Sequence, residues 1–166
     1  RADLLPQVSR RAAHLDDLDL HPPLITVDGS DKIVYDRSKP RNAVLETLDT
    51  EIIRDAERFF SAGEKMQLHY AVRNTLRTIG TRTSSMIVQT FGMKNKLQPD
   101  HLTVRLTGSA GQSLGAVAAL GLKIEVMGDA NDYVGKGLSG GLIVVRPQMA
   151  SPLVASENTI IGNTVL

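Results

Sequence analysis

A glycine-rich stretch near the C-terminal end of this sequence is the motif that most resembles a nucleotide-binding site. Residues 135–140 read Gly-Lys-Gly-Leu-Ser-Gly and so satisfy the G-x-G-x-x-G fingerprint. That fingerprint requires a helix whose N-terminus meets the pyrophosphate, whereas residues 142–145, Leu-Ile-Val-Val, continue as a strand. Lys136 also lacks the spacer and following helix of a P-loop lysine. We favour a structural role for the loop, and phosphate or nucleotide binding by Gly135–Gly141 is the alternative.

The remaining chemically able residues do not form a catalytic or metal-binding set. The histidines, at positions 14, 21, 69 and 101, lack the i, i+4 spacing of a metal site. Asp129, Asn131 and Asp132 resemble the start of a calcium loop, but Tyr133 and Val134 replace the next ligand and the turn glycine. We expect these acidic residues to cap a corner. We predict no catalytic, cofactor-binding or metal-binding residue in this chain.

Cysteine is absent from the sequence, and this removes several mechanisms together. The chain can supply no disulfide, no thiolate-held iron–sulfur cluster and no cysteine nucleophile. Arg73, Arg77 and Arg82 could bind an anion. We favour instead that they tie a strand–helix junction to backbone carbonyls or to another domain, because a guanidinium offers several donors.

Charge and hydropathy bound the partners and the compartment. The formal net charge is +1 with the two signs interspersed, which argues against nucleic-acid binding. No apolar run is long enough to span a bilayer, and the first residues lack the pattern of a signal peptide, so we expect a cytoplasmic protein. The sequence opens on Arg1, which leaves both a fragment of a longer protein and a stand-alone subunit open.

Hydrophobic periodicity predicts the elements that hold these residues. Residues 1–41 are irregular and are interpreted as a linker, with a short strand at residues 24–27. Apolar residues recur at three- and four-residue steps from Ala43 to Phe60, which predicts an amphipathic helix with Asn42 as its N-cap and Gly63 as its stop. We further predict strands at residues 66–72 and 102–106 and a second helix at residues 81–91.

A repeat of twenty residues is the strongest pattern in the chain. Residues 104–108 align with residues 124–128, and the match continues to Leu122 over Leu142. A third instance begins at residues 143–146 and, after an insertion at residues 148–152, resumes with Ile161 over Val134. A repeat of this length without helical periodicity predicts a solenoid whose coils stack short parallel strands.

Glycine and asparagine are expected to form the corners of the coils, where the chain needs a positive φ or a close backbone approach. We expect Asn131 to adopt the left-handed conformation. The predicted structural corner residues are Gly108, Gly111, Gly115, Gly121, Gly128, Asn131, Gly135, Gly137, Gly140, Gly141 and Gly162. Two coils are complete and the third is truncated, so we expect further coils or a capping partner to cover the open strand edge.

Two coil phrases of this sequence resemble a known family. Residues 106–115, and still more closely residues 128–141 with 143–147, are similar to the coil motifs in the C-terminal domain of the glutamate synthase large subunit. Arg73, Arg77 and Arg82, with their neighbours Asn74, Thr75, Ile79 and Gly80, resemble the segment that leads into that domain. The resemblance covers residues 66–166 closely and residues 1–65 more loosely.

The resemblance implies a mainly β domain, a right-handed parallel β-helix over residues 63–166, after a linker and flanking amphipathic helix at residues 1–62. It implies a non-catalytic spacer between the glutaminase domain and the FMN-containing synthase domain of one parent. Such a parent makes two glutamates from glutamine and 2-oxoglutarate, using FMN, an iron–sulfur cluster and NAD(P)H or ferredoxin. Related coils also occur in a subunit of formylmethanofuran dehydrogenase, which is a second alternative.

Overall fold

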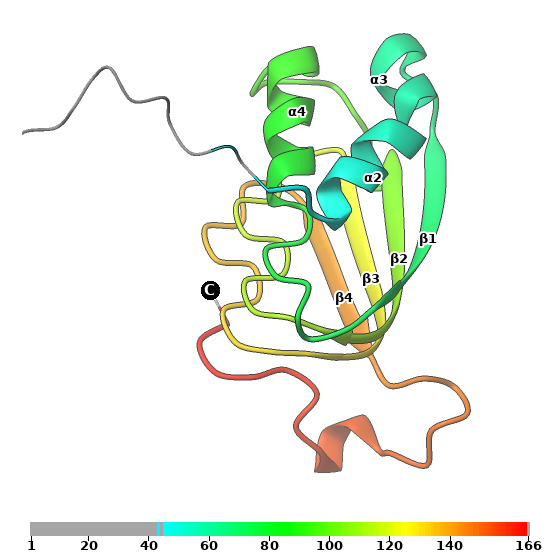
Figure 1. Ribbon diagram of the computed structural model, residues 1–166, viewed down its shortest axis with the longest axis vertical. Coiled ribbons are helices and arrows are strands. Elements are labelled where there is room, and N and C mark those ends of the chain that lie inside the picture. Colours follow the sequence, from blue (N-terminus) through cyan, green and yellow to red (C-terminus); the bar gives the residue numbers. More distant parts are fainter. Residues whose placement is uncertain (1–42, 44, 166) are drawn as a thin grey trace, which may run out of the picture. The chain divides into compact units, whose positions relative to one another are not determined.

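The computed structural model describes residue 43 and residues 45–165 (Figure 1). The predicted linker, the strand at residues 24–27 and the Asn42 cap therefore lie outside the described residues. The described elements belong to one compact unit, Val44–Leu166. In chain order they are α2 (Leu48–Asp55), α3 (Glu57–Ala62), β1 (Met66–Val72), α4 (Thr81–Phe91), β2 (Leu102–Ala110), β3 (Leu122–Ala130), β4 (Leu142–Arg146) and a short 3-10 helix, η4 (Ala155–Glu157).

The predicted amphipathic helix is present, but it begins later and is divided in two. Thr47 is its N-cap, and the Thr47 N–H donates to the Thr50 hydroxyl at 3.2 Å. The helical run breaks at Ala56, and α3 ends at Ala62 with Gly63 as its C-cap, which confirms Gly63 as the predicted stop. The φ of Gly63 is 68°, in the left-handed region. The helix predicted at residues 81–91 is confirmed with the same limits as α4.

The strands form one parallel sheet in the order β1-β2-β3-β4. Strand β2 pairs with β3 from Leu102 opposite Leu122 to Ala110 opposite Ala130, which confirms the twenty-residue alignment. Strand β1 pairs with β2 in the same direction, with Met66 opposite Leu102. The repeat therefore starts one strand earlier than predicted. This first coil is longer than the others, because α4 and the loop after it separate β1 from β2.

The predicted alignment of the last coil is wrong in two places. Leu142 lies opposite Lys123 rather than Leu122, because the coil after β3 is one residue shorter than the coil after β2. This register turns Ile143 toward the core, since adjacent side chains on a strand point to opposite faces. Ile161 lies opposite Ala130 rather than Val134.

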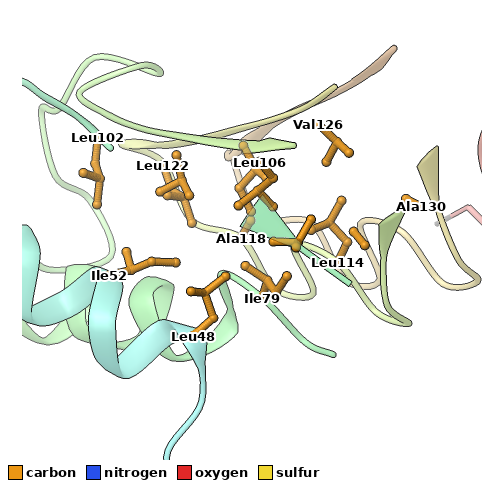
Figure 2. Packing of buried hydrophobic residues seen from close by; sticks show 14 of the residues in the cluster. Leu48, Ile52, Ile79, Leu102, Leu106, Leu114, Ala118, Leu122, Val126 and Ala130 are labelled. Atoms are coloured by element: carbon orange, nitrogen blue, oxygen red, sulfur yellow. The ribbon is translucent and has the colours of Figure 1, made fainter. Parts of the chain in front are cut away.

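The described residues form a small α/β domain, which corrects the expectation of a mainly β domain. The helices and the corner loops cover one face of an open sheet whose edges are β1 and β4 (Figure 1). In the core, Leu102, Leu106 and Leu122 of the sheet point toward Leu48 and Ile52 of α2 (Figure 2). Leu114, Ala118 and Ile79 of the corner loops complete this cluster (Figure 2). No helix within residues 45–165 has the length and apolar character needed to cross a membrane.

Candidate functional site: the stacked corners and the open ends of the sheet

The Gly135–Gly141 loop uses most of its backbone amides within the protein. Five of them donate to backbone carbonyls at distances between 2.8 and 3.3 Å, those of Gly135, Lys136, Leu138, Ser139 and Gly141. The acceptors are Leu114 and Ala118 of the preceding coil and two carbonyls of the same turn. A phosphate-binding loop needs free N–H groups that converge on the anion, and a helix must follow. Here strand β4 follows, so the loop has the geometry of a corner rather than a phosphate cradle.

One corner recurs in the left-handed conformation along the stack. Thr78, Ser113, Tyr133 and Thr164 have φ between 53° and 63°. Hydrogen bonds join these corners: the N–H of Thr78 donates to Gln112, that of Ser113 to Asp132 and that of Tyr133 to Asn163. The predicted left-handed Asn131 is wrong, because Tyr133 occupies that conformation while the Asn131 side chain accepts from the Asp132 N–H. These backbone hydrogen bonds between successive corners form a ladder. The ladder, rather than the intrinsic preference of a residue, determines which residue adopts the left-handed conformation.

The predicted corner glycines fall into two geometric groups. Most have φ between 62° and 151°, namely Gly108, Gly115, Gly121, Gly128, Gly135, Gly137 and Gly140. At Gly128 an added Cβ would overlap the carbonyl oxygen of Gly108, so these two glycines let adjacent coils stack in contact. The other three, Gly111, Gly141 and Gly162, do not have a positive φ, but an added Cβ at each would collide with the neighbouring coil.

Burial of the inward-facing residues differs between the middle and the edges of the sheet. Six inward-facing side chains of β2 and β3 are at most 1% exposed, namely Leu102, Val104, Leu106, Leu122, Ile124 and Val126. In β1 the inward-facing Met66, Leu68 and Tyr70 are only half-buried, and in β4 the same holds for Ile143 and Val145. The core is therefore complete at the two central strands and incompletely covered at both edges.

A buried carboxylate that the sequence did not reveal fastens α2 to α4. Asp49 is 2% exposed and accepts the backbone N–H groups of Gly80 at 2.7 Å, Arg82 at 2.7 Å and Thr83 at 3.3 Å. The N-cap of α4 is Gly80, which has no side chain to accept these donors, so the acceptor comes from another helix. In the sequence, the only indication of this contact is that Gly80 occupies the N-cap position of α4, where a capping side chain is usual.

The predicted arginine and histidine candidates are dispersed. The Arg82 guanidinium donates to the Thr50 hydroxyl at 3.2 Å, which ties α4 to α2, while Arg73 and Arg77 are exposed. His69 is exposed, and His101 bonds the Gly63 carbonyl at 2.8 Å and so links the end of α3 to the start of β2. Among residues 43 and 45–165, no group of three or more histidine, aspartate or glutamate side chains could hold a metal ion. His14 and His21 lie outside the described residues.

Charged pairs cross the outer face of the sheet. Glu125 of β3 accepts from Lys123 at 2.5 Å and from Arg105 of β2 at 2.7 Å. These two cations, Lys123 foremost, hold the pKa of the Glu125 carboxyl below its usual range.

The inward-facing Tyr70 of β1 also has a shifted pKa. Burial and a 2.9 Å hydrogen bond to Asp55 raise the pKa of its hydroxyl. Each of these groups has a local partner, so their shifts reflect ion pairing and burial rather than a catalytic cleft.

This α/β domain with stacked glycine corners matches a known family. Residues 49–166 fit the family model described as "GXGXG motif", and the chain belongs to that family. All 166 residues are 63% identical to part of "Glutamate synthase [NADPH] large chain" of Azospirillum brasilense, of which they span 11%. The resemblance to a glutamate synthase GXGXG domain is thereby confirmed.

More distant relatives agree with this assignment. The chain is 35% identical over 98% of its length to "Glutamate synthase [NADPH] large chain" of Bacillus subtilis, of which it spans 11%. It is 43% identical over 70% of its length to "Glutamate synthase [NADH]" of Saccharomyces cerevisiae, of which it spans 5%. The chain thus covers about a tenth or less of the length of these relatives.

Proposed function

We propose that this chain is a structural and interaction module of a glutamate synthase. Its coils would begin a right-handed β-helix at residue 63, after the linker and helix of residues 1–62. The module would act as a spacer between the glutaminase domain and the FMN-containing synthase domain, with no catalytic residue of its own. The similarity to glutamate synthase large chains supports the parent, and the chain's small share of their length supports partners within the same polypeptide.

The observation that carries this proposal is the incomplete burial at both edges of the sheet. The inward-facing Ile143 and Val145 of β4 remain half-buried, although the equivalent side chains of β3 are buried completely. Apolar side chains and the unpaired edge of a parallel strand are stabilised when another coil covers them. Strand β4 presents both together, as expected of a coil inside a longer stack.

The chemistry of the proposed parent would take place elsewhere. The relatives' names specify NADPH, NADH and ferredoxin as reductants, and we propose that the parent uses one of these with FMN and an iron–sulfur cluster. This chain does not fit those groups, because it has no cysteine for a cluster and the amides of its glycine loop are engaged. We therefore assign no step of glutamate formation from glutamine and 2-oxoglutarate to its residues. We also propose a cytoplasmic location for the parent.

A substitution at the open edge tests the proposal. Ile143→Ser is compared with Ile124→Ser, its partner position on β3. We measure thermal unfolding of each variant in the isolated chain and in the full-length parent. Ile124 is buried in both settings, so its substitution should lower the unfolding temperature in both. Ile143→Ser should have a small effect in the isolated chain and an effect like that of Ile124→Ser in the parent.

Two results would contradict the proposal. The first is an equally small effect of Ile143→Ser in the parent and in the isolated chain, which would mean that nothing covers β4. The second is glutaminase activity, or one tightly bound flavin per molecule, in the isolated chain. The alternative of a nucleotide-binding loop is not supported, because its amides already have acceptors.

A further inference from the structure

Two corner residues are unfavourable in both backbone conformation and exposure. Val117 has a φ of 52° and is 51% exposed, and Tyr133 has a φ of 63° and is 42% exposed. A β-branched or aromatic residue is an outlier in the left-handed region, where glycine or asparagine fits at lower cost. Such strained conformations persist where surrounding contacts compensate their cost. Within the described residues, these two have much of their surface in solvent.

These residues belong to one continuous surface on the corner loops. The N–H of Val117 donates to the Lys136 carbonyl at 2.8 Å, and the Lys136 N–H donates to the Tyr133 carbonyl at 3.3 Å. The Lys136 ammonium lies 5.8 Å from the centre of the Tyr133 ring. Leu138, in the same turn, is 45% exposed. We call Val117, Tyr133, Lys136 and Leu138 the corner patch. The loops that carry these residues are stacked beside the sheet (Figure 1).

We propose that the corner patch is an anchor for another domain of the parent polypeptide, whose surface is apolar and presents a carboxylate to Lys136. This inference rests on the proposed function. Tyrosine is one of the residue types that most often dominate an interface, so Tyr133 is the main anchor of the patch. The cross-coil hydrogen bonds make this backbone rigid, and burial in the interface would offset the strain at Val117 and Tyr133.

A domain of the same polypeptide fits the corner patch better than a second copy of this chain. In a two-fold contact between copies, the patch would meet itself and bring two Lys136 ammonium groups together. The chain spans 11% of the similar Azospirillum large chain, so nearly all of such a parent lies outside it. A tethered domain is present at high effective concentration and therefore needs less contact area than a free partner, which needs about 1,200 Å².

Hydroxyl-radical footprinting with peptide mass spectrometry tests this inference on unmodified proteins. The isolated chain and the full-length parent are labelled under the same conditions, and labelling is read at the corner patch and at Ile143 and Val145. We expect labelling of Val117, Tyr133 and Leu138 to fall several-fold in the parent. Unchanged labelling of the corner patch beside protection of Ile143 and Val145 would overturn this inference alone. No protection at either place would overturn the proposed function as well.

A pair of substitutions gives a second readout. Tyr133→Gly removes the left-handed strain and the exposed ring together, so it should leave the unfolding temperature of the isolated chain unchanged or raise it. In the parent the same change should lower that temperature, because it deletes an interface anchor. Thr78→Gly is the matched control, since Thr78 occupies the same left-handed corner outside the patch. An equal response of Tyr133→Gly in the two proteins would contradict the inference.

Discussion

The buried carboxylate of Asp49 gives the sharpest prediction about stability. It is the only described side chain that accepts three backbone N–H groups, and two of the donors, Gly80 and Thr83, are themselves buried. In Asp49→Ala these donors lose their acceptor, while water has little access to replace it. The substitution also removes a negative charge from the N-terminal end of α4, where the helix dipole favours one.

The size of the effect follows from these contacts. An unsatisfied buried donor costs about 1–3 kcal/mol, and the three bonds act as a unit rather than additively. We therefore expect Asp49→Ala to lower the free energy of unfolding by roughly 3–5 kcal/mol. Asp49→Asn keeps the size and one acceptor but loses the charge, and should cost roughly 2 kcal/mol.

Urea denaturation of the 166-residue chain, followed by circular dichroism, measures both changes. Asp55→Asn is the matched control, because Asp55 lies on the same helix but accepts only from two side chains, the exposed Arg54 and the half-buried Tyr70. Its cost should stay below about 1 kcal/mol. The reasoning is refuted if Asp49→Ala unfolds at the same urea concentration as the unsubstituted chain, or if Asp55→Asn is the more damaging change.

Three further predictions concern charge, backbone and ligands. Because Lys123 lowers the pKa of Glu125 below its ordinary value of 4.5, the ion pair stabilises the fold fully above pH 4.5 and less as the pH falls through the lowered pKa. The stability of Glu125→Gln should therefore depend less on pH in this acid range than that of the unsubstituted chain. Identical pH profiles of the two proteins would contradict the pairing. Gly128→Ala should cost about 3 kcal/mol or more in urea denaturation because its Cβ would overlap a carbonyl, whereas Gly92→Ala, with open space around it, should cost about 1 kcal/mol; equal costs would refute the stacking argument. Calorimetric titration of the isolated chain with FMN or NAD should show no binding, and micromolar binding lost in Lys136→Ala would overturn the corner interpretation.

Much of the sheet could be predicted because one uninterrupted repeat of twenty residues leads from β2 to β3. This spacing places Leu102 over Leu122 and keeps the inward-facing apolar and small residues of the two strands in register over nine pairs. The first coil escaped detection because α4 interrupts it after the corner at Thr78. The last coil was misaligned because it is one residue shorter, although the alternation of Ile143 and Val145 on the inner face carried the correct register.

The features that define the candidate site depend on contacts between distant residues. Asn131 has the stronger intrinsic preference for the left-handed region, but the ladder from Ser113 to Asn163 passes through Tyr133. Asp49 lies far from α4 in the sequence and is indistinguishable there from a solvated first-turn acid. Local preference could predict that glycines form corners, but it could not predict which carbonyl each corner would contact.

Amide hydrogen exchange of the isolated chain and of the full-length parent tests the central claim most directly. The claim is that these coils form part of a longer stack and that β4 is covered there. The account predicts equal protection of the β2 and β3 amides in both proteins, and much slower exchange of the residue 142–146 amides in the parent than in the isolated chain. Equal exchange of the β4 amides in both proteins would contradict it.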